Sequence, residues 1–244
     1  MRVVITAGAP LDGAYARAAG TSLKALAPLR GSTMLARTLD VCAELHIDEV
    51  AVVGNDAIAR ACDGRRVRIV PDAGSGAANV RAALAAWPDD DEPLLYLTCD
   101  MPFLDARSLR SYLERSPGGA LTMALCEYDA FEHRFPGAPP FGITLAGERV
   151  VNGGAFVIPP RVRARVADRA MRLFDARKSP WRMAAVAGVP LLLRLAFGTL
   201  SIAALEARAR DLLGTEVVAV RGCAPELGYD ADTAAEYLYA CDRI

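Results

Sequence analysis

The sequence of 244 residues is short of histidine, has no paired cysteines and carries no excess of charge of either sign. Its 28 Lys and Arg residues balance 29 Asp and Glu residues, for a net charge of −1. That balance argues against a protein that binds nucleic acid through a basic patch. With only His46 and His133 present, a histidine-based metal site is not expected. The six cysteines are scattered and form no CxxC pair, so they indicate buried thiols in a reducing cytoplasm rather than a disulfide framework or a zinc site.

A long uninterrupted apolar segment is also missing. The first residues, MRVVITAGAP, lack the length and the apolar core of a signal peptide and lead straight into a strand. Residues 183–200 approach membrane-spanning length, but Arg194 lies inside that segment, as do Gly188, Pro190 and Gly198. We therefore expect a broken pair of buried helices there and no stable membrane span, with a segment at the membrane interface as the alternative.

Strands and helices alternate along the first half of the chain. Apolar runs predict strands at 2–8, 48–54, 65–72, 93–100 and 119–128, and helical spacing predicts helices at 31–46, 56–64, 76–87 and 105–116. Strands separated by helices of this length make a parallel sheet with helices on both faces. Right-handed crossovers then favour a doubly wound, Rossmann-like α/β fold with a mostly parallel sheet.

The second half is less regular. A strand is predicted at 150–158, helices through 160–213, another strand at 216–222 and a closing helix at 232–243. No internal repeat, low-complexity tract or linker divides the chain. We therefore expect one domain, residues 1–244, with a helical carboxyl-terminal elaboration.

Asp100 stands at the end of the most apolar strand, in PLLYLTCDMPFLD. In open parallel sheets ligands bind beyond the carboxyl ends of the strands. A carboxylate there is a natural hard-oxygen ligand for Mg²⁺, which usually takes one or two protein carboxylates together with substrate phosphates. The structural alternative is that Asp100 caps a turn and Pro102 ends the strand.

The loop after the first strand places the small residues Ala7, Gly8 and Ala9 where backbone N–H groups can approach a polyphosphate. Lys24 follows as a mobile point charge suited to phosphate oxygens. The loop has neither GK[ST] nor G-x-G-x-x-G, so it is not a P-loop or a dinucleotide fingerprint. A plain strand-to-helix turn with a surface lysine is the alternative.

Three later segments carry further candidates. Asp230 and Asp232 precede a predicted helix that Thr233 and Glu236 could start. They are candidates for the site, and the alternative is that they are acids that only cap the helix start. In VVNGGAFVI, Asn152 can bind a substrate hydroxyl, while Gly153 and Gly154 allow close backbone approach or form a β-bulge. In ARKSPW, Arg177 and Lys178 either bind an anion or face solvent.

Taken in order, these segments resemble the MobA-like nucleotidyltransferases, a family with a Rossmann-like fold of the GT-A type. Members open with a small-residue LAGG loop followed by a lysine and G-x-P-[ML]; TAGAP, Lys24 and GSTML match here. Their D-x-P strand end is matched by TCDMPFLD, and their D-x-DTPED-like ending by YDADTAAEY. An uncharacterised bacterial subgroup is closer still, since RFPGAPPFG, VNGGAF, ARKSPW and FGTLSIAALEAR resemble its motifs. The resemblance covers nearly the whole chain.

The resemblance implies Mg²⁺-dependent transfer of an NMP from an NTP to a small phosphorylated acceptor, with release of pyrophosphate. It assigns the catalytic roles to Lys24, Asp100 and Asp232, and the metal to Asp100 and Asp232 with Asp230 as substitute. Nucleotide contacts fall to Ala7, Gly8, Ala9, Asp72, Gly74, Ser75 and Asn79, and acceptor contacts to Asn152, Gly153 and Lys178. Acceptor, base preference and oligomeric state stay open.

The sequence departs from the family pattern at several positions. The usual second glycine of the phosphate loop is Ala9 here, followed by Pro10, and the arginine that normally follows the loop has no clear equivalent, with Arg17 as the one candidate. DTAAEY replaces DTPED, and PPFGIT stands where the subgroup has an Arg-Thr pair. These changes keep two alternatives open: a non-catalytic nucleotide sensor, and a GT-A glycosyltransferase that uses a nucleotide sugar.

Overall fold

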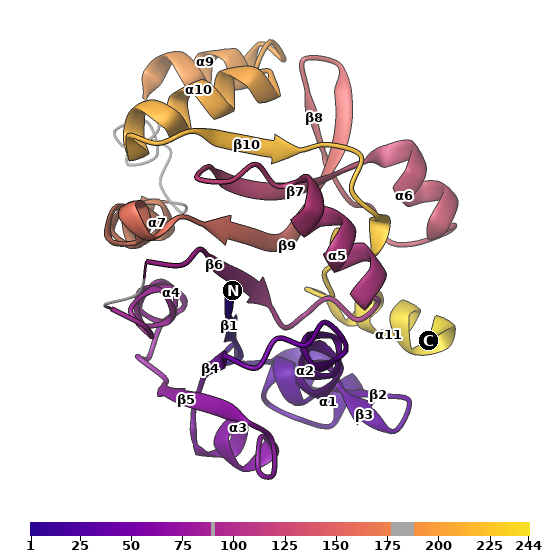
Figure 1. The fold of residues 1–244 in the computed structure, drawn as a ribbon. Coiled ribbons are helices and arrows are strands. Elements are labelled where there is room, and N and C mark those ends of the chain that lie inside the picture. Colours follow the sequence, from indigo (N-terminus) through magenta and orange to yellow (C-terminus); the bar gives the residue numbers. More distant parts are fainter. Residues whose placement is uncertain (89–90, 177–187) are drawn as a thin grey trace.

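A computed structural model describes residues 1–88, 91–176 and 188–244 (Figure 1). In this part of the chain, eight strands form a single sheet in the order β10-β7-β9-β6-β1-β4-β5, with β8 paired to β9. The strands are β1 (Arg2–Thr6), β4 (Val50–Gly54), β5 (Val67–Pro71), β6 (Leu94–Thr98), β7 (Leu121–Glu127), β8 (Ile143–Leu145), β9 (Glu148–Ile158) and β10 (Val217–Val220). The predicted alternation of strands and helices in the first half is therefore confirmed.

The sheet is mostly parallel, with β9 as the reversed strand at its centre. β1 pairs in parallel with both β4 and β6, and β10 pairs in parallel with β7. β9 lies antiparallel between β6 and β7. The carboxyl ends of β1, β4 and β6 therefore meet at one edge, together with the middle of β9.

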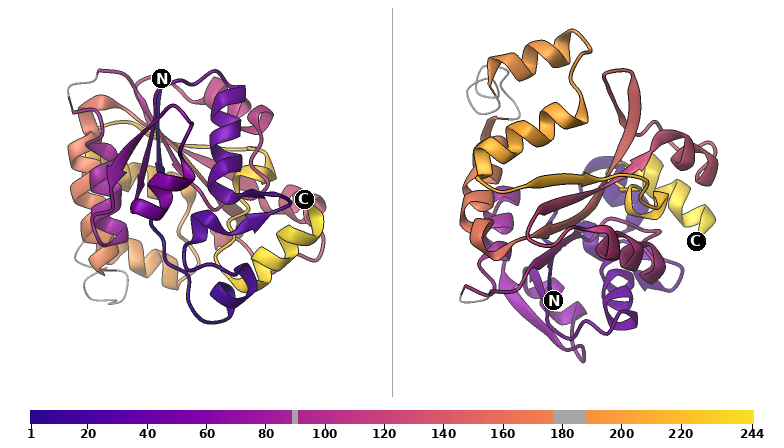
Figure 2. Two further views of the ribbon diagram at one scale, coloured as in Figure 1. Left: turned by 90° about the horizontal axis from the view of Figure 1, so that it is seen from below. Right: turned by 45° about the horizontal axis from the view of Figure 1, so that its top comes forward.

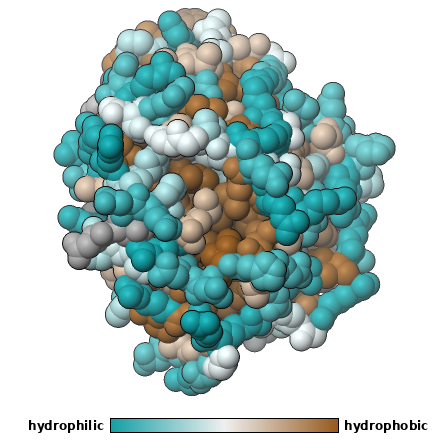
Figure 3. Space-filling model, viewed as in Figure 1, coloured by the Kyte–Doolittle hydropathy of each residue, from teal (hydrophilic) through white to brown (hydrophobic). Residues whose placement is uncertain are grey.

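Helices cover both faces of this sheet, as Figure 2 shows. They are α1 (Gly13–Ala19), α2 (Met34–Glu44), α3 (Asp56–Ala61), α4 (Gly76–Leu84), α5 (Ala106–Arg115), α6 (Tyr128–Arg134), α7 (Arg163–Ala176), α9 (Val189–Ala196), α10 (Ile202–Leu213) and α11 (Ala234–Arg243). The apolar sides of α2 and α5 share one buried cluster with alternate residues of β1 and β6. α4 and α7 share the cluster on the opposite face. From the side shown in Figure 1 the surface is mainly hydrophilic around a central hydrophobic area (Figure 3).

Side-chain caps begin several helices where the sequence has Ser, Thr or Asp. Asp105 accepts from the Ser108 backbone N–H at the start of α5. Thr233 and Glu236 form a reciprocal capping box at the start of α11. Each such cap satisfies backbone donors that the first helical turn leaves free.

The segment between β1 and α2 contains more structure than the sequence predicts. It holds α1, a 3₁₀ turn at Lys24–Leu26 and a two-stranded hairpin of β2 (Pro28–Leu29) and β3 (Ser32–Thr33). The helix predicted from residue 31 therefore begins three residues later. Arg30 and Gly31 have φ values of 41° and 79°, which suit a tight hairpin turn and not a helix.

Residues 183–200 fall partly outside the described residues. The described part contains α9, which lies between Gly188 and Gly198, and the rest of the predicted pair lies outside the described residues. The predicted burial is wrong, because α9 has no buried residue and Phe197 next to it is 77% exposed. The sheet faces are already covered by other helices, and only the side of Leu191 packs on the core. In the described residues no helix combines the length and apolar character needed to cross a membrane.

Candidate functional site

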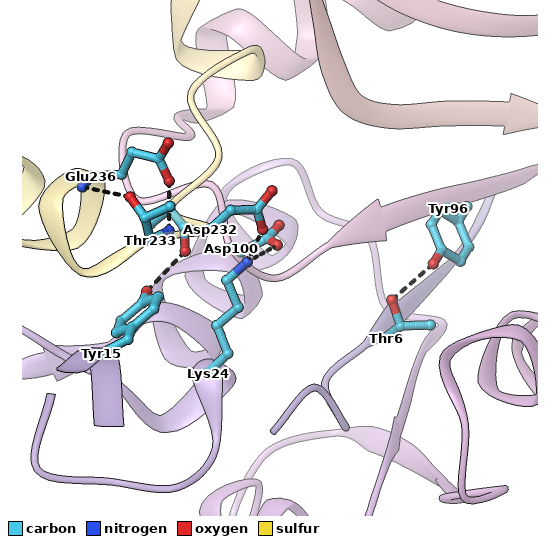
Figure 4. Close-up of polar contacts among 9 residues, drawn as sticks. Thr6, Tyr15, Lys24, Tyr96, Asp100, Asp232, Thr233 and Glu236 are labelled. Atoms are coloured by element: carbon cyan, nitrogen blue, oxygen red, sulfur yellow. Dashed lines mark hydrogen bonds and ion pairs between the residues drawn. The ribbon is translucent and has the colours of Figure 1, made fainter. Parts of the chain in front are cut away.

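Lys24 joins two carboxylates that are far apart in the sequence. Its Nζ lies 2.6 Å from Asp100 Oδ2 and also donates to Asp232 Oδ1, as Figure 4 shows. The Lys24 side chain is 8% exposed and that of Asp100 is 18% exposed, whereas Asp232 is 72% exposed. The ammonium group therefore lies at the bottom of an open acidic site, with one buried and one solvent-facing partner.

Short local structures hold these side chains in place. Lys24 begins the 3₁₀ turn, and its backbone N–H donates to Ala9 O at 3.0 Å, which ties it to the loop after β1. Asp100 follows β6 by two residues, and its carbonyl accepts from Ala231 N at 2.9 Å. The Tyr15 hydroxyl donates to Ala231 O at 2.9 Å. One residue of the carboxyl-terminal loop is therefore fixed from two sides.

Asp230 lies beside this group but is not bonded to it. Its Oδ1 is buried and has no hydrogen-bond partner in the described residues. Burial, with Asp100 and Asp232 nearby, raises the pKa of Asp230 well above its ordinary value. Burial alone would lower the pKa of Lys24, but Asp100 and Asp232 outweigh it and raise that pKa. Lys24 is therefore charged, and Asp230 favours its neutral form.

The predicted phosphate loop packs against the start of α4. A Cβ on Gly8 would lie 2.9 Å from Asn79 Nδ2 and 3.3 Å from Asp72 Oδ2, so a larger residue there would displace these two side chains. Asn79 Oδ1 accepts from Ala73 N, Asp72 Oδ1 accepts from Gly74 N, and Ser75 caps α4. Six predicted nucleotide contacts line one pocket of about 930 Å³: Gly8, Ala9, Asp72, Gly74, Ser75 and Asn79.

Ala7 does not take the place expected for it. It is fully buried, and its backbone N–H donates to Val53 O at 2.9 Å. The ladder between β1 and β4 thus continues one residue past β1. The prediction that the Ala7 amide binds phosphate is wrong for this reason.

The predicted acceptor residues differ in their surroundings. Gly153 has Leu227 O and Ala124 Cβ within 3 Å of where its Cβ would be, and the β7–β9 register shifts opposite it. Its glycine is therefore required by a bulge and close packing. Asn152 is exposed on β9, where it pairs with Leu125 of β7. Arg177 and Lys178 lie outside the described residues.

Sequence reasoning missed an aromatic wall beside the site. Tyr96 and Thr98 point into the pocket from β6, and Phe156 faces them from β9. Tyr96 OH lies 2.9 Å from Thr6 Oγ1 (Figure 4). Hydroxyl-bearing residues at alternate positions of an otherwise apolar strand were the available signal.

The acidic site suits a hard cation that a ligand helps to hold. No group of three or more His, Cys, Asp or Glu side chains able to hold a metal occurs in the described residues. Asp100 and Asp232 instead offer two carboxylates, and Asp100 Oδ1 is buried without a partner there. Two carboxylates plus phosphate oxygens are what Mg²⁺ commonly takes, so the donors fit such an ion.

Several solved structures are similar to this chain over nearly its whole length. A hypothetical transferase from Thermus thermophilus is 28% identical with a TM-score of 0.81, covering 97% of this chain and 100% of the other. A nucleotidyl transferase from Methanothermobacter is 18% identical with a TM-score of 0.59, covering 99% and 95%. The 2-C-methyl-D-erythritol 4-phosphate cytidylyltransferase of Thermus thermophilus is 15% identical with a TM-score of 0.58, covering 99% and 97%. The last two show likeness of fold.

No curated protein matches the chain. The model of the MobA-like NTP transferase domain matches residues 11–220, a span that contains Lys24 and Asp100 and ends before Asp232. The sheet order, the pocket and the lysine between two carboxylates are consistent with that match. The chain therefore belongs to the MobA-like NTP transferase domain family.

Proposed function

We propose that the protein is a Mg²⁺-dependent nucleotidyltransferase that transfers an NMP from an NTP to a small phosphorylated acceptor. The observation that carries the proposal is the position of Lys24 between Asp100 and Asp232, beside the pocket that begins at Gly8. Leu23 and Thr98 line that pocket next to Lys24 and Asp100 in the sequence. A nucleotide in the pocket can therefore extend its phosphates toward the charged group.

The reaction needs charge and alignment more than covalent help. An acceptor phosphate oxygen attacks the α-phosphorus of the NTP, the bond to the bridging oxygen breaks, and pyrophosphate leaves. Mg²⁺, held by Asp100 and Asp232 with Asp230 beside them, supplies positive charge to the phosphates when bound. Lys24, always charged and on a flexible stem, neutralises phosphate oxygens in the transition state.

The remaining residues orient the two substrates. Asp72 and Asn79 lie against Gly8, and together with Ser75 they line the polar end of the pocket, where we place the base. Asn152 on β9 faces the acceptor, and we retain Lys178 as a second acceptor contact. The rigid sheet beneath Asp100 keeps these parts aligned, which is what a catalytic constellation requires.

A nucleotide sensor without turnover is the second candidate. It is favoured by the loop after β1, where the Ala7 amide is used by the sheet and Pro10 has no N–H. Fewer amides are then free to cradle a triphosphate.

Product analysis separates the candidate functions. Pyrophosphate release in the presence of acceptor distinguishes a nucleotidyltransferase from a sensor, and release of a nucleoside diphosphate from a nucleotide sugar indicates a glycosyltransferase.

The test is calorimetric titration of CTP, GTP, UTP and ATP, each with and without Mg²⁺. Wild type is compared with Asp100→Asn, which keeps the shape of the site, and with Asp48→Asn, an exposed acid elsewhere on the surface. We expect one nucleotide to bind only with Mg²⁺, to lose binding in Asp100→Asn and to bind Asp48→Asn unchanged. Binding that ignores both Mg²⁺ and Asp100 would contradict the proposed function.

A further inference from the structure

The pocket beside the acidic site has a volume of about 930 Å³, with one polar and one apolar end. Its polar end lies at Gly8 and the start of α4. From there it runs between the sheet and helices α4 and α7 to a second end, which the described residues line without a charged side chain. That end is lined by Leu84, Tyr96, Leu121, Phe156, Ile158 and Val166. The proposed base and phosphate contacts use none of these side chains.

An aromatic pair forms the wall of the apolar end. Tyr96 and Phe156 are register partners on β6 and β9, and their rings meet edge to face at 6.0 Å and 67°. The Tyr96 hydroxyl is already bonded to Thr6 Oγ1 at 2.9 Å. Burial raises the pKa of Tyr96 to about 12, so this hydroxyl stays neutral. The wall therefore presents mainly ring carbons to a ligand.

The apolar end is within reach of the charged group. Tyr96 lies on β6, and Asp100 follows the end of β6 by two residues; four residues of chain span at most about 13 Å at the usual strand rise. Thr98 lies between them and also lines the pocket, and Leu23 lines it next to Lys24. A molecule with a phosphate near Lys24 can therefore place a tail of several carbon atoms against Tyr96 and Phe156.

The chemistry of this lining selects the kind of tail. Each hydroxyl of a sugar, or each edge nitrogen of a base, would lose water there and leave its hydrogen bonds unmade. A hydrocarbon tail has no hydrogen bonds to lose, and its removal from water is favourable. The base is better served by Asp72, Ser75 and Asn79 at the polar end.

We propose that the acceptor is the phosphate monoester of an apolar alcohol, whose alkyl or aryl part occupies the pocket between Tyr96, Phe156 and Val166. This inference rests on the proposed nucleotidyl transfer and narrows its acceptor to one class. The monoester's terminal phosphate oxygen forms a new bond to the α-phosphorus, the bond to the leaving pyrophosphate breaks, and a P–O–P linkage joins the alcohol phosphate to the NMP. Atoms and charge balance without any oxidant or further reactant.

The experiment measures binding of hexyl phosphate, ethyl phosphate and glycerol 3-phosphate to protein saturated with Mg²⁺ and an α,β-methylene NTP analogue. Saturation is first verified by calorimetry, so that failure of nucleotide binding is seen separately as failure of the proposed function. We expect hexyl phosphate to bind at least about tenfold more tightly than ethyl phosphate, since each buried methylene contributes about fourfold. Glycerol 3-phosphate, with its two free hydroxyls, should bind no better than ethyl phosphate.

Two variants on α7 test where the tail of the acceptor binds. Val166→Phe fills the apolar end from the half-buried Val166, and Ala164→Phe adds the same ring at an exposed position of the helix. We expect Val166→Phe to weaken hexyl phosphate at least about tenfold while leaving nucleotide binding intact, and Ala164→Phe to change neither. Folding of both is checked by thermal unfolding, and Phe156→Leu gives a second variant if Val166→Phe is unstable. The inference is overturned if nucleotide binds but hexyl phosphate does not, if glycerol 3-phosphate binds as tightly, or if both variants behave alike.

Discussion

Replacing Lys24 by methionine tests the buried charge at the centre of the site. The Lys24 side chain is 8% exposed and its partner Asp100 is 18% exposed. Methionine keeps the length of the side chain but leaves the Asp100 carboxylate without its cation. Breaking a buried pair in this way costs about 3–5 kcal/mol, because one charge stays buried and unpaired; the lower end of this range applies here, since Asp100 is only partly buried.

The exposed partner contributes much less. Asp232 is 72% exposed, and a pair with such an exposed member contributes up to about 1 kcal/mol at most. The desolvation of the lysine itself opposes the pair, since burial alone would lower the pKa of Lys24. We therefore expect Lys24→Met to reduce the free energy of unfolding of the metal-free protein by about 3 kcal/mol.

Urea unfolding at neutral pH with a chelator measures this loss. Asp100→Asn and the double variant complete a thermodynamic cycle. Because the double variant has no buried charge left at this pair, it should be more stable than Lys24→Met alone. If Lys24→Met costs less than about 1 kcal/mol, or if its effect simply adds to that of Asp100→Asn, the pair behaves like a surface ion pair and the reasoning fails. Added Mg²⁺ should restore part of the lost stability by binding the freed carboxylates.

Three further changes have defined outcomes. Because the native pKa of Asp230 is raised, the native state keeps a proton that the unfolded chain releases above about pH 4. Metal-free wild type should therefore lose stability as the pH rises from there through the native pKa of Asp230. Urea titrations across this range should show a smaller decline in the free energy of unfolding for Asp230→Asn. Thr98→Val should stabilise the protein by about 1 kcal/mol, since Thr98 Oγ1 is buried without a partner in the described residues; a lower melting temperature would indicate a bonded hydroxyl. Gly154→Ala should destabilise by about 1–3 kcal/mol, because its Cβ would meet Thr98 Oγ1 and lie 2.9 Å from the Met101 sulfur, whereas Gly118→Ala, with open space around it, should melt near wild type.

Local patterns predicted β1, β4, β5, β6, β7, β9 and β10 but not β8 or the β2–β3 hairpin, and they singled out Asp100 as a candidate. Asp100 was predictable because a buried strand that stops at an acid places that acid at the ligand-binding edge of a parallel sheet. Lys24 was harder, since it lies in a segment with little periodicity. The resemblance to a family located it, and the 3₁₀ turn that positions it has no sequence signature long enough to predict.

The features that were missed depend on register rather than on pattern. The direction of β9 follows from the intervening α6 and β8, which the sequence did not indicate. Only with β9 antiparallel to β6 does Phe156 face Tyr96 and the apolar end of the pocket come into existence. Similarly, burial raises the pKa of Asp230, whereas Asp232 is exposed. The sequence could not show this difference, because both acids directly precede the same helix.

The choice of lysine at residue 24 follows from the same geometry. The chain contains only two lysines, Lys24 and Lys178, and takes its other cationic side chains from arginine. A guanidinium group spreads its charge over a plane and prefers one carboxylate in a two-pronged contact. Lys24 must instead fit a compact charge between Asp100 and Asp232. When a cation and a triphosphate claim those carboxylates, a single ammonium on a flexible stem can turn from them to the phosphate oxygens, which a bidentate arginine would do only by breaking both of its bonds.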